Sequence, residues 1–227
     1  MNKKIAWIID STAFVSEQLR HHPDVYVVPL TIHFGREQFQ DNVDLTTEQL
    51  HARIRESETS ATTSQPAPGT FAVLYEALKE HYDEAIAVHL SSPLSGTYES
   101  SKTGAGLANF PIRAIDSRSI SGNITALVER GIALHERGMS VDEIVETLEE
   151  MKTRRRAYAL IGKLDQLRKS GRVSGIQFFL GSLLHIKPVI RVSEEGLLVP
   201  DKKIRSEKRA FNYLRDLVLE SRETIED

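Results

Sequence analysis

The chain contains no cysteine among its 227 residues. This absence excludes disulfide bonds, catalysis by a thiolate and zinc sites built on cysteine ligands. It fits a reducing compartment, and we expect a cytoplasmic protein. No apolar run approaches the roughly 18 residues that a membrane-spanning helix needs. The first apolar stretch stops at Asp10, which is too short for a signal peptide and is typical of a first β-strand. We therefore expect no membrane span and no more than transient contact with a membrane surface.

A strong excess of one charge is also missing. The 29 lysines and arginines nearly balance the 32 aspartates and glutamates, which gives a formal net charge of -3. Nucleic-acid affinity comes mainly from a basic electrostatic field, so this balance argues against a nucleic-acid partner. Hydrophobic residues make up 40% of the chain and charged residues 27%, as in ordinary globular proteins. This composition can build the core of one large domain or of two small ones.

Several motifs of nucleotide and acyl-transfer chemistry are absent. There is no G-x-x-x-x-G-K-[ST] loop for ATP phosphates and no G-x-S-x-G nucleophile turn. The segment GAGLAN (104–109) resembles part of a dinucleotide fingerprint, but it lies inside a helical pattern and lacks the last glycine. No two histidines are spaced as H-x-x-x-H on a predicted helix, so we expect no metal site.

Strand patterns and helix patterns alternate along residues 1–155. Alternation of this kind predicts an α/β domain with a mostly parallel sheet sandwiched by helices. We predict strands at 5–9, 25–34, 85–90 and 112–115, and helices at 46–57, 69–82, 97–108, 119–137 and 141–155.

The pattern changes after about residue 156, so we place a domain boundary near 153–157. Residues 156–227 are predicted to form a second, smaller α/β domain with a mixed sheet. It has strands in AYALIG and HIKPVIRV, a short apolar helix at 174–184, a hairpin turn at Glu195-Gly196 and a final helix at 206–221.

Three turns rich in hydroxyl groups follow predicted strands: DST (10–12), SSPLSG (91–96) and DSRSISG (116–122). The carboxyl ends of the strands in an open parallel sheet line its ligand crevice, so we expect these turns to face one cleft. A fourth such segment, TSQPAPG (63–69), precedes a predicted helix.

Two of these segments, TSQPAPG and SSPLSG, are read as helix starts. A helix N-terminus offers free backbone N–H groups and partial positive charge, and serine or threonine adds hydroxyl donors. Such sites suit a carboxylate or a phosphate without lysine or arginine. For either segment alone, ordinary helix capping explains the residues better, whereas the two together favour a ligand.

Asp10, at the end of the first predicted strand, has two interpretations. It resembles a phosphotransfer nucleophile or a metal ligand by its place in the chain. No second acidic residue lies nearby, because Ser11 and Thr12 follow it. We therefore favour an aspartate that accepts hydrogen bonds from the neighbouring turn.

Residues across almost the whole chain resemble the DegV family, whose characterised members bind fatty acids. The pair TSQPAPG and LSSPLSGTYESS (90–101) is the most specific part of the resemblance. The other matching segments are IIDSTAFVS (8–16), PLTIHF (29–34), IDSRSISG (115–122), LRKSGRVSG (167–175), GSLLHIKPVI (181–190) and KKIRSEKRA (202–210).

The resemblance implies two α/β domains with a long-chain fatty acid between them. Its carboxylate would be held by the hydroxyls of Thr63 and Ser95. The neighbours of the carboxylate would be Thr62, Ser92, Gly96 and, near the head-group end, Arg172. We expect an apolar passage for the acyl chain, although the same residues could instead be plain core: Leu94, Phe178, Phe179, Leu183 and Ile186.

Members of the family usually continue for several tens of residues past the helix that matches 206–221. The second domain of this chain is therefore expected to be incomplete relative to the family. In some bacteria such proteins present the bound acid to a separate ATP-dependent fatty acid kinase, so a kinase subunit is an expected partner.

Three classes of function stay open at this point. We favour a fatty-acid carrier that is not itself a catalyst and needs no cofactor. The alternative is a phosphotransferase or phosphatase-like enzyme that uses Asp10 and the hydroxyl-rich turns. The third is a regulatory or interaction protein in which the ligand only stabilises the fold.

Overall fold

The computed structural model describes residues 3–57, 61–162, 170–172 and 186–223. The chain divides into two compact units, Met1–Arg155 and Arg156–Asp227, and each unit is described by itself. The helix predicted at 174–184 lies outside the described residues.

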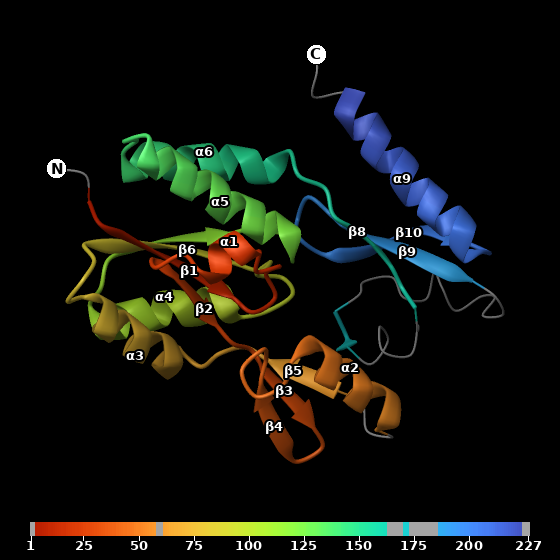
Figure 1. Ribbon diagram of the computed structural model, residues 1–227, viewed down its shortest axis with the longest axis horizontal. Helices are drawn as coiled ribbons and strands as arrows, with labels where there is room; N and C mark the ends of the chain where they lie inside the picture. Colours follow the sequence, from red (N-terminus) through yellow and green to blue (C-terminus); the bar gives the residue numbers. More distant parts are fainter. Residues whose placement is uncertain (1–2, 58–60, 163–169, 173–185, 224–227) are drawn as a thin grey trace. The chain divides into compact units, whose positions relative to one another are not determined.

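A four-stranded parallel sheet forms the centre of the first unit (Figure 1). Its strands lie in the order β2-β1-β6-β7, and all three neighbouring pairs are parallel, as predicted. Every residue of β1 and β6 is buried, which is why IAWIID and EAIAVH carry so few polar residues. The four strands are β1 (Ile5–Asp10), β2 (Val25–Val28), β6 (Glu84–His89) and β7 (Ile112–Asp116).

Helices cover both faces of this sheet (Figure 1). One face packs against α3 (Pro68–Leu78) and α4 (Thr97–Ala108). The other packs against the short α1 (Glu17–Arg20), α5 (Gly122–Glu136) and α6 (Val141–Thr153). Side chains of β1 alternate between the two cores: Trp7 and Ile9 enter the core of α5 and α6, whereas Ala6 and Ile8 enter that of α3 and α4. The predicted sandwich is therefore confirmed.

Helices α3 and α4 approach each other closely at Gly104. A Cβ atom on Gly104 would lie 2.4 Å from Phe71 Cβ and 2.7 Å from the Pro68 carbonyl oxygen. We expect Gly104→Ala to push the helices apart and to lower the free energy of unfolding by about 1–3 kcal/mol. Urea unfolding measures this loss. Gly106→Ala is the control, since Gly106 lies on the same helix with open space around it; equal losses in both variants would contradict the packing argument.

The sequence did not indicate the second sheet of this unit. β3 (Thr31–Phe34), β4 (Glu37–Gln40) and β5 (Ala61–Ser64) form an antiparallel sheet in the order β4-β3-β5. The run 25–34, predicted as one strand, is therefore two strands in different sheets, separated by Pro29 and Leu30. Proline has no amide hydrogen to donate to a β-ladder, which favours a break at this point.

One helix covers the second sheet. Helix α2 (Thr47–Glu56) begins with a reciprocal capping box between Thr46 and Gln49. The Arg53 guanidinium lies over the Phe34 and Phe39 rings, 5.2 and 4.8 Å from their centroids. These cation–π contacts fix α2 on the face of the sheet that carries the two rings.

The described strands of the second unit are β8 (Tyr158–Leu160), β9 (Lys187–Val192) and β10 (Leu198–Ile204). Both strand pairs are antiparallel, so the prediction of a mixed sheet is wrong for these strands. The hairpin turn predicted at Glu195-Gly196 is confirmed: Gly196 has φ +83° and donates its N–H to the Ser193 carbonyl at 2.9 Å.

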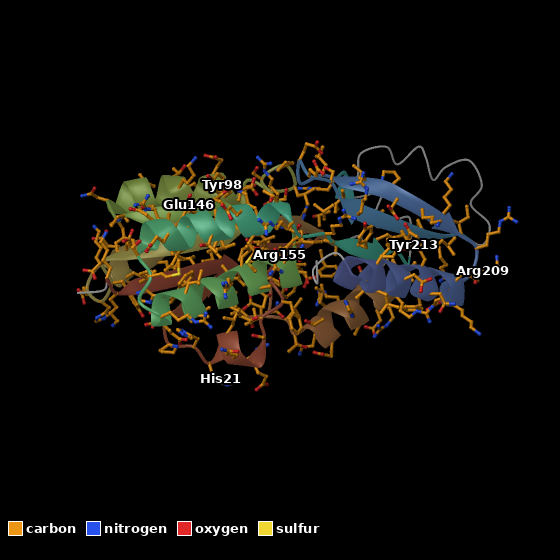
Figure 2. The ribbon with its side chains drawn as sticks, turned by 90° about the horizontal axis from the view of Figure 1, so that it is seen from above. His21, Tyr98, Glu146, Arg155, Arg209 and Tyr213 are labelled. Atoms are coloured by element: carbon orange, nitrogen blue, oxygen red, sulfur yellow. The ribbon has the colours of Figure 1, made fainter. Side chains whose placement is uncertain are left out.

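Helix α9 (Glu207–Glu223) packs on this second-unit sheet. Tyr213, labelled in Figure 2, donates its hydroxyl to Asp201 Oδ2 at 2.7 Å. The Lys202 ammonium lies 4.1 Å from the Tyr213 ring centroid. Burial and the Asp201 carboxylate raise the pKa of the Tyr213 hydroxyl to about 12. None of the helices in the described ranges is long and apolar enough to span a membrane.

Candidate functional site

The turns that follow β1, β6 and β7 meet at the carboxyl edge of the parallel sheet. Ser91 donates its N–H to the Ser119 carbonyl at 2.9 Å, and Ser121 donates its N–H to the Thr12 carbonyl at 3.1 Å. The three turns predicted to face one cleft therefore share one edge of the sheet, and the cleft itself stays a prediction. The strand order is β2-β1-β6-β7, so the chain passes from β1 to β2 on one side and from β6 to β7 on the other. The direction of the connections therefore reverses between the neighbouring strands β1 and β6. Open α/β sheets bind ligands outside such a point.

Asp10 is fully buried at this edge and joins β1 to β6. Its Oδ1 accepts hydrogen bonds from Thr12 N–H at 3.1 Å and from the Thr12 hydroxyl at 2.5 Å. Its Oδ2 accepts a hydrogen bond from Leu90 N–H at 2.8 Å and lies 3.3 Å from His89 Nδ1. The interpretation of Asp10 as an acceptor for the neighbouring turn is thus confirmed. No part of the Asp10 side chain is exposed at the surface.

The charge state of Asp10 follows from these contacts. Burial raises its pKa, but hydrogen bonding and charge interaction with His89, together with the bonds from Thr12 and Leu90, outweigh burial. The pKa of the Asp10 carboxyl is therefore lower than its ordinary value. The carboxylate is ionised at neutral pH, where it serves as an acceptor for the turn.

Ser92 is held by the carboxylate at the end of β7. Its hydroxyl donates to Asp116 Oδ2 at 2.6 Å, and its N–H donates to Asp116 Oδ1 at 3.1 Å. Arg118 N–H donates to the same Oδ1 at 2.9 Å. Because the Ser92 proton is engaged by Asp116, this hydroxyl has no proton left for an anionic ligand. Ser92 therefore shapes the turn from which Ser95 projects.

The helix start predicted in TSQPAPG is confirmed, but Thr63 itself lies on strand β5, before that helix. Helix α3 begins at Pro68, and its N-cap residue Ala67 makes no side-chain cap bond. In the β3–β5 register Thr63 pairs with Ile32 and Thr62 pairs with His33. Successive side chains of a strand point to opposite faces, so only one of Thr62 and Thr63 can face a given ligand.

Ser95 lies half-buried in the turn before α4, next to the half-buried Leu94. Gly96 is the N-cap residue of α4 and makes no side-chain cap bond. Ser95 Oγ accepts a hydrogen bond from Thr97 N–H at 3.4 Å and lies 2.9 Å from the Thr97 hydroxyl. When Thr97 donates its hydroxyl to Ser95, the Ser95 proton is left for another acceptor. Thr97 is fully buried.

Gln65 joins the two hydroxyl-bearing segments. Its Oε1 accepts a hydrogen bond from Gly96 N–H at 3.1 Å, and its Nε2 donates to Ser100 Oγ at 3.4 Å. The β5 strand end, with Thr63, therefore lies beside the turn that carries Ser95. The Gly96 amide, expected near a carboxylate, is already bonded to Gln65. The sequence analysis did not predict a role for Gln65 or Thr97 individually. Both residues lie inside motifs that it did single out, TSQPAPG and LSSPLSGTYESS.

The remaining residues expected at the site belong to the second unit. Arg172 is exposed, and its Nη1 donates to the Ser170 carbonyl at 2.6 Å. Ile186 is half-buried directly before β9. Phe178, Phe179 and Leu183 lie outside the described residues. No group of three or more histidine or acidic side chains in the described part of the chain is arranged to hold a metal ion.

Comparison with known proteins identifies relatives over nearly the whole chain. A family model whose description reads "Uncharacterised protein, DegV family COG1307" matches residues 4–226. A DegV domain-containing protein of Halalkalibacterium halodurans is 35% identical over 219 residues, which cover 96% of this chain and 77% of the relative. Protein DegV of Bacillus subtilis is 33% identical over 220 residues, covering 94% of this chain and 76% of the relative.

Solved structures agree with these matches. The crystal structure of DegV from Bacillus subtilis, described as a fatty acid binding protein, aligns with a TM-score of 0.87 at 32% identity and covers 96% of this chain and 78% of its own. A fatty acid binding DegV family protein from Streptococcus agalactiae aligns with a TM-score of 0.88 at 28% identity, with the same coverage. A DegV family protein from Thermus thermophilus, with fatty acid binding in its description, aligns with a TM-score of 0.87 at 30% identity over the same shares.

Proposed function

The chain belongs to the DegV family, and from that premise we propose that it binds a long-chain fatty acid. Three solved relatives are described as binding fatty acids. The observation in this chain that carries the proposal is the contact of Gln65 with Gly96, which sets two hydroxyl-bearing segments side by side.

In this proposal the hydroxyls of Thr63 and Ser95 donate hydrogen bonds to the carboxylate. Thr97 supports Ser95 by donating to its oxygen, so that the Ser95 proton points to the ligand. The other expected neighbours act around this pair: Thr62 and Ser92 shape the two segments, and Gly96 accommodates Gln65. The family resemblance assigns Arg172 to the head-group end of the ligand.

The acyl chain supplies most of the binding free energy in this proposal. Burial of about 14 methylene groups, at about 0.8 kcal/mol each, gives on the order of 11 kcal/mol before losses are subtracted. We assign the lining of the acyl passage to Leu94, Phe178, Phe179, Leu183 and Ile186. The carboxylate contacts then fix the register of the chain, and the shape of the passage sets which acyl chains fit.

We further propose that the protein is a carrier and not a catalyst. The buried Asp10 of the enzymatic alternative has its oxygens occupied by hydrogen bonds from Thr12 and Leu90. Neutral hydroxyls hold a carboxylate without a salt bridge, so release of the acid breaks only hydrogen bonds. Release of this kind suits delivery to a separate ATP-dependent fatty acid kinase, and the family resemblance supports that partner.

Native mass spectrometry of the freshly purified protein tests the proposed function. We expect an added mass equal to that of a sixteen- to eighteen-carbon fatty acid, which organic solvent extracts and lipid analysis identifies. The delipidated protein should then take up palmitate. The proposal fails if the purified protein carries no fatty acid and the delipidated protein does not bind palmitate. A magnesium-dependent phosphatase activity that Asp10→Asn abolishes would instead support the enzymatic alternative.

A further inference from the structure

We propose that Gln65 is a positioning residue that sets the distance between the two hydroxyls that bind the carboxylate. The inference rests on the proposed function and extends it to a residue that touches neither the acyl chain nor the carboxylate. Gln65 acts through Gly96, and the pair joins the residue that follows β5 to the N-cap residue of α4.

The two ends of the Gln65 amide have different partners. Oε1 accepts from the N–H of Gly96, the N-cap residue of α4, and Nε2 donates to the Ser100 hydroxyl one turn further along the helix. Ser100 is buried, with 4% of its surface exposed, so it gives the amide a fixed partner. Two bonds to one helix hold the chain at Gln65 in both distance and orientation. Thr63 lies two residues before this anchor, and Ser95 directly precedes Gly96.

The hydrogen bond from Gly96 N–H to Gln65 also affects how the carboxylate of the ligand is bound. A free N–H at the N-terminus of a helix attracts anions, because it adds a donor to the positive end of the helix dipole. Gln65 fills this donor with a neutral carbonyl oxygen. The carboxylate is then left to the hydroxyls of Thr63 and Ser95. A glutamate at position 65 would accept the same hydrogen bond but would place a negative charge beside the ligand.

Gly96 is the complementary half of the contact. A Cβ atom at this position would lie 2.4 Å from Gln65 Nε2 and 2.7 Å from Oε1. The backbone of Gly96, with φ -75° and ψ +10°, is accessible to alanine. Alanine would therefore displace the flexible Gln65 side chain while α4 keeps its conformation. The glycine is needed to make room for the amide.

A double-mutant cycle tests the inference on delipidated full-length protein. Palmitate and the neutral hexadecanol compete for the site with a fluorescent apolar probe. We expect Gln65→Ala and Gly96→Ala each to weaken palmitate binding by about 3- to 10-fold, because misplacement of the Thr63 and Ser95 hydroxyls outweighs the gain from the Gly96 N–H group that each substitution frees. The double variant should bind no more weakly than Gln65→Ala, because the three atoms nearest to the added methyl group all belong to the Gln65 amide, which is then gone. Hexadecanol affinity and melting temperature should stay unchanged.

A negative charge introduced at position 65 provides a second, independent test of the inference. We expect Gln65→Glu to weaken palmitate binding more than Gln65→Ala does, with hexadecanol affinity unchanged. Gln38→Glu is the matched control, because Gln38 lies exposed on β4 and carries the same change of charge. It should leave palmitate affinity unchanged.

The outcomes separate this inference from the function on which it rests. If the wild-type protein does not bind palmitate, the proposed function fails and the inference fails with it. If the wild type binds palmitate and Gln65→Ala binds it equally well, the function stands and the inference is overturned. Additive losses in the double variant, or an equal loss for hexadecanol, would also overturn the inference, because they indicate general damage to packing.

Discussion

Replacing Thr63 by valine and Ser95 by alanine together is expected to weaken palmitate binding by about 100-fold or more. A hydrogen bond to a charged group contributes about 1.5–3 kcal/mol, and each 1.4 kcal/mol corresponds to a tenfold change in affinity. Each single variant should therefore lose about 10- to 100-fold, and the double variant should lose more. Valine keeps the shape of threonine, and Thr63 is exposed, so its substitution leaves the core intact.

Isothermal titration of the delipidated variants with palmitate measures this effect. Thr147→Val is the matched control, because the Thr147 hydroxyl donates within its own helix to the Glu143 carbonyl at 2.8 Å. The control should bind palmitate as the wild type does, and thermal unfolding should show that all the variants are folded. Unchanged affinity in the double variant would remove both hydroxyls from the head-group site, even if the protein still binds the acid.

The second large effect concerns stability. Asp10→Ala is expected to lower the free energy of unfolding by about 3–5 kcal/mol at neutral pH, the cost of removing one partner from a buried charged network. The substitution leaves the N–H groups of Thr12 and Leu90 without their acceptor. Asp10→Asn keeps the shape and one acceptor oxygen, so it should lose less. Urea unfolding of both variants measures the difference.

The stabilisation by Asp10 is expected to depend on pH. The pKa of the Asp10 carboxyl is lowered in the folded state, so its contribution to stability is present above the unfolded pKa. It is lost as the pH falls through the folded pKa. The gap between wild type and Asp10→Ala should therefore be largest above about pH 5 and should narrow below about pH 4. A gap that stays constant down to acid pH would contradict the role assigned to the ionised carboxylate.

Asp41 provides an internal control with the opposite shift. Burial is the largest effect on the Asp41 carboxyl and raises its pKa, and the nearby Asp10 charge raises it further. Hydrogen bonds from Ser11 and from the backbone of Asn42 lower the pKa, but the net shift is upward. The ionised form of Asp41 is therefore less favourable in the folded protein than in the unfolded chain. Asp41→Asn should leave stability at neutral pH unchanged or slightly increased. A loss as large as that of Asp10→Ala would indicate that any carboxylate removed near this edge destabilises the fold.

The sequence by itself determined the elements whose signals are local. Continuous apolar runs identified β1 and β6, because both strands are buried on their two faces. Helix α6 follows from its capping pair, in which Ser140 accepts a hydrogen bond from Glu143 N–H. The hairpin turn follows from Gly196, because glycine readily adopts the positive φ that this residue has in the structure. Each of these signals depends on residues within a few positions of one another.

The sheet β4-β3-β5 was decided by tertiary pairing. β4 reads EQFQ and β5 reads ATTS, and neither has the apolar alternation that marks a strand. Both strands exist because β3 lies between them and supplies the hydrogen-bonding edges. Thr63 therefore appeared in the sequence as part of a helix start and lies in the structure on a strand.

In the candidate site, too, some features were predictable from the sequence and others were decided by the tertiary structure. The sequence picked out the hydroxyl-rich turns, because strand ends and helix starts leave local patterns of serine, threonine, proline and glycine. The contact between Gln65 and Gly96 joins residues 31 positions apart, and no local pattern encodes which side chain will meet which amide. That choice follows from strand register and helix packing, since both are settled only when the whole unit buries its core.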